Sequence, residues 1–123
     1  MVEIAPQRFG RLAAMLPVQD MNRARDFYCS VLGFHKTFEN GTPVQFMILK
    51  RDEAELHLTL QLDHMPPGFN VAHLLVEDAI ALHDACVTHG CAIIKPLKDQ
   101  DYGLRAFVFE DTEGNRIDVG EPI

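Results

Sequence analysis

The fold is decided by two stretches that repeat one pattern, Leu16-Pro17-Val18-Gln19-Asp20 and Leu74-Leu75-Val76-Glu77-Asp78. Each stretch is an apolar strand end followed by an Asp, and each leads into residues with helical spacing. A glycine follows each helical stretch, Gly33 in the first copy and Gly90 in the second. Asp is a preferred N-cap residue, and glycine tolerates the left-handed conformation that ends many helices. The sequence therefore predicts two copies of a strand, a helix and further strands.

Alternating and helical spacing of apolar residues gives the expected elements. In the first copy we expect a strand at 12–18, a helix at 21–32 and strands at 36–39, 44–50 and 55–62. In the second copy we expect a strand at 70–76, a helix at 79–89 and strands at 92–95, 104–110 and 116–119. The pair Asn40-Gly41 is typical of a two-residue hairpin turn.

These elements predict an α+β fold in a single domain, residues 1–123, made of two βαβββ modules. Module one spans about 11–62 and module two about 70–120, and a linker rich in proline and glycine joins them at about 63–69. Together the modules form a curved sheet that encloses a cleft. The side chains that line this cleft decide the function.

Composition excludes several functional classes. The formal net charge is −7, without any basic run, so we expect no nucleic-acid partner. No apolar run approaches the ~18 residues of a membrane span, and the N-terminal residues lack a signal-peptide pattern, so we expect no membrane partner and a cytoplasmic protein. The three cysteines are scattered and contain no CxxC motif.

Strand alternation assigns side chains to the cleft. Leu56 and Leu58 alternate with His57, so His57 is expected to face the cleft, either bound to a polar neighbour or touching a ligand. Asp118 alternates in the same way and has candidate partners in its own module and in His57. Candidate ligand-binding residues are His57, Asp118, Arg105, His73, Met15 and Phe107. We expect no catalytic residues, because neither a Ser-His-Asp nor a Cys-His arrangement is readable.

Three segments carry a resemblance to a known family. They are the strand end Leu16–Asp20, the phrase running from Phe27-Tyr28 to Leu32-Gly33-Phe34, and Phe107-Val108-Phe109-Glu110-Asp111-Thr112-Glu113-Gly114-Asn115. Within a duplicated domain these segments resemble the vicinal oxygen chelate superfamily, which includes glyoxalase I, extradiol dioxygenases, fosfomycin-resistance thiol transferases and bleomycin-resistance proteins. The resemblance covers roughly residues 11–120.

The resemblance implies four positions at which metal-dependent members hold their ion. On this chain the positions fall on Ala13, His57, Val71 and Asp118. Two of them carry aliphatic side chains, which cannot bind a metal. His73 lies near Val71 but would need a rearranged site. We therefore expect no cofactor; the alternative is one divalent ion such as Mn, Fe, Ni or Zn, held by His57 and Asp118.

The chain is accordingly most similar to metal-free members of the bleomycin-resistance type, which are linked to antibiotic resistance. This similarity implies a homodimer that binds and sequesters a small organic molecule without transforming it. An alternative is a metal-dependent lyase, isomerase or dioxygenase of the same superfamily. A second alternative is a protein-interaction module without a small-molecule site.

Overall fold

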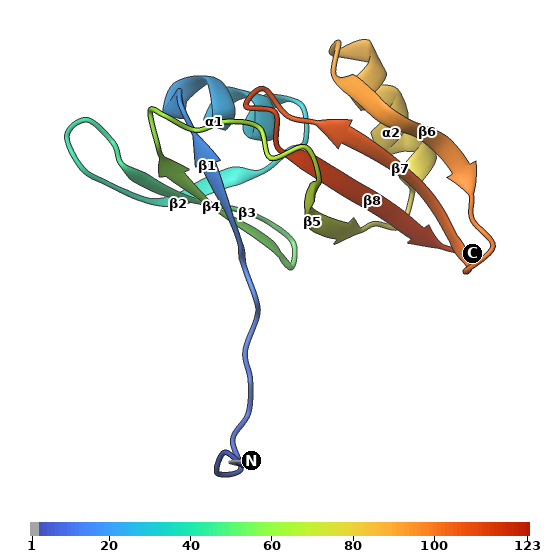
Figure 1. The fold of residues 1–123 in the computed structure, drawn as a ribbon, viewed down its shortest axis with the longest axis horizontal. Helices are drawn as coiled ribbons and strands as arrows, with labels where there is room; N and C mark the ends of the chain where they lie inside the picture. Colours follow the sequence, from blue (N-terminus) through green and yellow to red (C-terminus); the bar gives the residue numbers. More distant parts are fainter. Residues whose placement is uncertain (1–2) are drawn as a thin grey trace.

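The computed structural model describes residues 3–123, and these residues form two helices and eight strands in two sheets (Figure 1). Module one contains β1 (Ala14–Val18), α1 (Met21–Ser30), β2 (His35–Asn40), β3 (Phe46–Arg51) and β4 (Ala54–Leu60). Module two contains β5 (Asn70–Leu75), α2 (Ala79–Thr88), β6 (Ala92–Asp99), β7 (Leu104–Glu110) and β8 (Arg116–Pro122). The predicted α+β fold with two βαβββ modules is confirmed.

The two sheets have the same topology. Their strand orders are β1-β4-β3-β2 and β5-β8-β7-β6, so the first and last strands of each module are neighbours. The pair that contains these two strands is parallel in both modules, β1 with β4 and β5 with β8, and the other pairs are antiparallel. The sheets lie side by side, with β1 close to β5 and both helices over one side (Figure 1).

The repeated Asp residues start the two helices as the sequence predicts. The Asp20 carboxylate accepts a hydrogen bond from the Arg23 amide at 3.0 Å, and Asp78 accepts one from the Ala81 amide at the same distance. Both helices are ten residues long. Within residues 3–123, neither helix has the length and apolar run that a transmembrane helix needs.

Two local predictions are wrong. The Asn40-Gly41 pair does not make a two-residue turn, because five residues, 41–45, separate β2 from β3. Pro43 lies in this loop, and a proline cannot donate to a strand ladder. Strand β6 runs to Asp99 instead of ending at Lys95, and it contains Pro96. A proline is tolerated there because β6 is an edge strand and its pairing with β7 shifts between Lys95 and Lys98.

The core lies between the sheets and the helices and is shared by both modules. Leu16 and Val18 of β1 and Val119 of β8 are fully buried in it. Phe27 of α1 contacts Phe109 of β7, with ring centroids 6.1 Å apart, so an aromatic contact crosses from one module to the other. A shared core fixes the two sheets relative to each other.

The turn between β7 and β8 fastens module two to module one, and we call its residues Asp111–Asn115 the clasp. The buried Glu113 carboxylate accepts hydrogen bonds from the backbone amides of Gln19 and Asp20, at 3.0 and 3.1 Å. Asn115 donates from its side-chain amide to the Pro17 carbonyl at 3.0 Å. The clasp thus fills the junction between β1 and α1.

Asp111 is the buried anchor of the clasp. Its carboxylate accepts hydrogen bonds from the Tyr28 hydroxyl and from the amides of Glu113 and Asn115. Burial raises the pKa of the Asp111 carboxyl, and the hydrogen bonds oppose that rise. Burial also raises the pKa of Tyr28 well above its ordinary value, so the phenol stays a donor.

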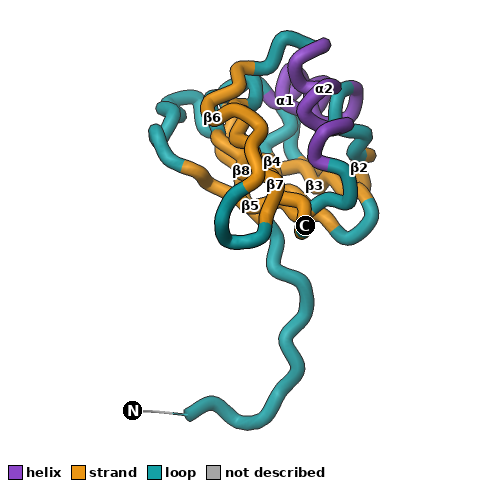
Figure 2. Tube along the Cα trace, turned by 90° about the vertical axis from the view of Figure 1, so that its right-hand side faces the viewer, coloured by secondary structure: helices purple, strands orange, loops and turns teal. Residues whose placement is uncertain are grey.

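An N-terminal arm, residues 3–12, precedes β1. It contains neither helix nor strand, and its residues are exposed. Figure 2 shows the arm leaving the body at the end away from the helices. Ile4, Phe9 and Leu12 are large apolar side chains that the arm exposes.

The clasp predicts a difference between the two tyrosines of the chain. Tyr28→Phe should lower the free energy of unfolding by about 1–3 kcal/mol, because the buried Asp111 carboxylate loses a donor. Tyr102→Phe is the matched control, since Tyr102 is 65% exposed, and it should change the free energy by less than about 0.5 kcal/mol. Urea unfolding measures both. Equal effects of the two substitutions would contradict this account of the clasp.

Candidate functional site

The sheets turn one face to the helices and leave the other open, and we call the open side the concave face. Residues paired across neighbouring strands point to the same side of a sheet. His57 of β4 pairs with Met15 of β1 and with Ile48 of β3. His73 of β5 pairs with Asp118 of β8. Leu56, Leu58, Ile117 and Val119, which alternate with His57 and Asp118, are buried on the helix side.

His57 is held in a hydrogen-bonded cluster. Its Nε2 lies 2.7 Å from Glu55 Oε2, and its ring packs edge-on against Phe46 with centroids 5.3 Å apart. Glu55 also accepts from Arg11 at 2.8 Å and lies 3.4 Å from Lys50 Nζ. The hydrogen bonds from His57 and then Arg11 lower the pKa of Glu55 to about 2. Glu55 therefore stays ionised and orients the His57 imidazole.

Asp118 takes His73 as its partner. The His73 Nδ1 lies 3.0 Å from the Asp118 carboxylate, whereas Arg116 bonds to Glu110 and to the Gly68 carbonyl. Gly120 lies beside this pair, where a Cβ would make an ordinary contact with the His73 ring at 3.6 Å and a tight one with Leu104 at 3.1 Å. Each sheet thus presents one imidazole and one carboxylate on its concave face.

Met15 lies on the concave face as the sequence predicts, and its side chain is 63% exposed. Phe46 and Ile48 flank His57 on the same face, and Phe38 of β2 packs against Phe46 with centroids 6.2 Å apart. Sulfur and aromatic groups of this kind make an adaptable apolar surface. Polar pairs set among apolar side chains suit the recognition of a small organic molecule.

The predicted placement of Arg105 and Phe107 in the cleft is wrong. Phe107 is 1% exposed, and its ring packs edge-on against His83 of α2. Arg105 pairs with Asp99, at 2.7 Å, on the same side of β7 as Phe107. Both side chains therefore lie on the helix side, because the strand register puts Ala106 and Val108 opposite Gly120 and Asp118.

Glu55 is a site residue that sequence reasoning left out of the candidate set. It lies two residues before His57 and therefore on the same face of β4. Alternation along the strand predicts that Glu55 lies on this face. The hydrogen bond from Arg11 could not be predicted from a local pattern, because Arg11 is distant from Glu55 in sequence.

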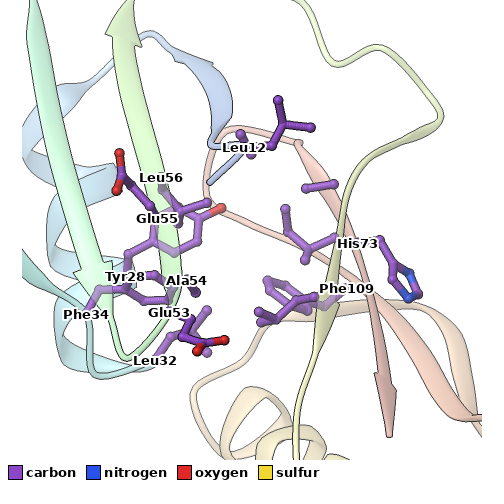
Figure 3. Close-up of a pocket in the computed structure, with 14 residues that line it drawn as sticks. Leu12, Tyr28, Leu32, Phe34, Glu53, Ala54, Glu55, Leu56, His73 and Phe109 are labelled. Carbon is purple, nitrogen blue, oxygen red and sulfur yellow. The ribbon is translucent and has the colours of Figure 1, made fainter. Parts of the chain in front are cut away.

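A cavity lies in the seam between the modules, and we call it the seam cavity (Figure 3). Its volume is about 150 Å³, and its lining is mostly apolar. Tyr28 and Leu32 face Phe109 across it, while the His73 ring points away from the other labelled side chains (Figure 3). The seam cavity lies between the two modules, and Glu55 and His73, which belong to the imidazole–carboxylate pairs, also line it.

Comparison with known proteins identifies the family. A model of the Glyoxalase/Bleomycin resistance protein/Dioxygenase superfamily matches residues 8–119. The chain belongs to this superfamily. Among curated proteins, none matches this sequence.

Several solved structures share the fold. TnmS3 from Streptomyces sp. CB03234, described as an antibiotic binding protein, is 25% identical with a TM-score of 0.75, over 95% of this chain and 100% of that one. A superfamily member from Sphaerobacter thermophilus DSM 20745 is 26% identical with a TM-score of 0.77, over 92% of this chain and 98% of that one. A bleomycin-binding protein from Streptomyces verticillus, solved with copper(II)-bleomycin, is 24% identical with a TM-score of 0.76. The match covers 96% of this chain and 100% of that one.

The residues do not fit the metal ion that some superfamily members hold. Ala13 and Val71 carry no donor atoms, and the two remaining positions, His57 and Asp118, are each hydrogen-bonded to a different partner. Among the described residues, no group of three His, Cys, Asp or Glu side chains lies close enough together to bind a metal. The donor set suits hydrogen bonding and ion pairing.

The His57–Glu55 pair has a measurable consequence for pH dependence. Because the folded pKa of Glu55 lies below its ordinary value, its contribution to stability is present above about pH 4.3 and is lost as the pH falls toward 2. His57→Phe should raise the pKa of Glu55, because it removes the hydrogen bond that lowers this pKa most. Carbon-detected NMR titration of the carboxyl groups measures this. His35→Phe, on exposed β2, should leave the pKa of Glu55 unchanged, and an equal shift there would refute the assignment.

Proposed function

We propose that this protein is a cytoplasmic binding protein that sequesters a small organic molecule on its concave face without transforming it. The observation that carries this proposal is the pairing of an imidazole with a carboxylate on each sheet, His57 with Glu55 and His73 with Asp118, beside exposed Met15. Such pairs offer both hydrogen-bond donors and acceptors to a ligand that stacks on apolar groups.

The chemistry of the site supports binding more than metal-dependent catalysis. Lewis-acid chemistry in this superfamily would need donors at Ala13 and Val71, and neither side chain can supply one. His57 and Asp118 lie on different sheets and have different partners. Metal-dependent lyase, isomerase or dioxygenase activity is therefore the weaker alternative.

An antibiotic is the ligand class that we propose. TnmS3, which shares a quarter of its residues with this chain over nearly its whole length, is described as an antibiotic binding protein. The apolar and aromatic surface around His57 suits a planar or conjugated molecule. Proteins that sequester such a compound confer resistance by lowering its free concentration.

We also propose that the protein acts as a homodimer whose partner subunit covers the concave face. Met15, Leu75 and Phe38 expose apolar surface there, and an isolated soluble chain rarely leaves such a face uncovered. The arm, which leaves the body at the end away from the helices (Figure 2), also exposes the side chains of Ile4 and Phe9. A second copy of the chain would bury these groups and close a cleft over each His–carboxylate pair.

Metal content separates the binding protein from the enzyme. Untagged protein prepared without chelator should contain far less than one metal ion per chain, and added Mn, Fe, Co, Ni or Zn should leave its melting temperature unshifted. Elemental analysis and a melting scan measure these quantities. One ion per chain that is lost in both His57→Ala and Asp118→Ala would overturn the proposal and favour the metal-dependent enzyme.

A ligand screen tests the binding site itself. Aromatic natural-product antibiotics, bleomycin among them, should include compounds that raise the free energy of unfolding, by about 2.7 kcal/mol at 100 times the Kd. His57→Ala and Asp118→Ala should each weaken that binding about tenfold. Arg105→Ala is the matched control and should leave the affinity unchanged, because Arg105 lies on the helix side. A screen without any stabilising compound would favour a protein-interaction module.

Sedimentation velocity tests the homodimer. The wild-type chain should sediment as a dimer at micromolar concentration, and Met15→Glu should shift it toward the monomer by placing a charge on the concave face. Val87→Glu is the matched control, since Val87 is also more than half exposed but lies on α2. If Val87→Glu dissociated the dimer and Met15→Glu did not, the helix side would be the interface instead.

A further inference from the structure

The two ends of the module seam are built differently, although the modules repeat one topology. At one end the clasp fills the junction between β1 and α1. At the other end the turn between β3 and β4 faces the junction between β5 and α2, and a groove of about 1110 Å³ opens between them. We call this opening the seam groove.

The residues of the β3–β4 turn explain why the groove stays open. With Phe46 aligned to Phe107, Lys50 stands where Asp111 does, Asp52 where Glu113 does, and Ala54 where Asn115 does. The Lys50 ammonium turns to Glu55, 3.4 Å away. The Asp52 side chain is 91% exposed, and Ala54 lacks the side-chain amide with which Asn115 donates. None of these three described residues repeats the hydrogen bonds of the clasp.

The seam groove has an apolar floor and an acidic rim. Leu32, Phe34, Leu74, Val76 and Leu82 contribute its apolar side chains. Asp52, Glu53, Glu77 and Asp78 contribute carboxylates to its lining, and all four residues are exposed. Arg51, the basic residue among its described lining residues, donates to the Leu32 carbonyl at 2.7 Å, and its Nε lies 3.8 Å from the Asp52 carboxylate. The lining therefore carries four carboxylates against one guanidinium.

The seam groove continues into the seam cavity. Both are lined by Leu32, Phe34, Glu53, Ala54 and Leu74. The seam cavity measures about 150 Å³, a size at which an engineered apolar protein cavity holds benzene. Tyr28 and Phe109 line it from opposite modules (Figure 3). A molecule in the groove could place a phenyl-sized group in this cavity and its polar end at the rim.

We propose that the seam groove is a second ligand site, which takes a small cationic amphiphile with an aryl or short alkyl group and an ammonium or guanidinium end. Its apolar group lies toward the seam cavity, and its cation lies at the carboxylates of the rim. A second copy of this chain fits the groove less well, because the chain itself carries a net charge of −7. This site goes beyond the function proposed above, because neither His57 nor Asp118 lines the seam groove or the seam cavity.

A matched series of three probes tests the charge preference: 4-phenylbutylammonium, 4-phenylbutanol and 4-phenylbutyrate. They share the phenyl group and the chain and differ in charge. Binding is followed by amide shifts in a two-dimensional NMR titration, with Leu82 and Ala85 as reporters within the groove. The cation should bind about three to ten times more tightly than the alcohol, and the carboxylate should bind most weakly. The preference should shrink in 0.5 M salt.

Variants locate the site. Asp52→Asn combined with Glu77→Gln should remove most of the preference for the cation, whereas Asp26→Asn combined with Asp63→Asn, which changes the net charge equally outside the groove, should preserve it. Ala81→Phe should abolish binding of all three probes by filling the groove from an exposed helix position. The unbound spectrum of each variant shows that it is folded.

Three results would overturn this inference. The first is equal affinity for the three probes, and the second is an equal loss of the preference for the cation in the groove pair and the control pair. A change of oligomeric state in Ala81→Phe, with probe binding retained, would show that the groove is a contact between copies and would also reject the ligand site. If the seam groove does not bind these probes, the function proposed for the concave face is not affected, because His57→Ala and Asp118→Ala test that site separately.

Discussion

The structure depends on one buried set of hydrogen bonds, the clasp that joins module two to module one. A buried carboxylate is costly unless it is hydrogen-bonded, and Asp111 and Glu113 each find donors that the other module supplies. Module two alone would leave Glu113 without these two backbone donors and Asp111 without the Tyr28 hydroxyl. Together with the shared core, this contact sets the position of one sheet against the other, and the concave face, the seam cavity and the seam groove depend on that position.

Repetition of one module explains both what is equal and what differs in the two halves. Parallel pairing of β1 with β4 and of β5 with β8 places His57 and Asp118 at matching points of the two sheets. The partners are not matched, because Glu55 lies on the same strand as His57 whereas His73 reaches Asp118 from the neighbouring strand. Duplicated positions have thus kept a polar character while their local chemistry has diverged.

Much of the fold could be predicted from the sequence, because the strand-to-helix junctions at Asp20 and Asp78 are set by local capping. The faces of β4 and β8 could also be predicted, since buried leucine, isoleucine and valine alternate there with His57 and Asp118. The faces of strand β7 could not be predicted, because apolar residues occupy both of them. Alternation therefore cannot assign Arg105 and Phe107 to the concave face or to the helix side. The partners of Glu113 and Asp118 are distant in sequence, so a local pattern could not identify them.

Charge connects the two sides of the molecule. Glu55 and Asp118 on the concave face and the carboxylates of the seam groove have the same sign, and the net charge of −7 extends that field around the chain. A long-range field of this kind attracts cations to both faces without distinguishing between them. Selectivity must then come from short-range features. On the concave face those features are the two imidazoles, which can donate to a ligand or accept from it. In the seam groove those features are carboxylates that border apolar side chains. The two sites therefore favour ligands of different chemistry, although the same electrostatic field surrounds both.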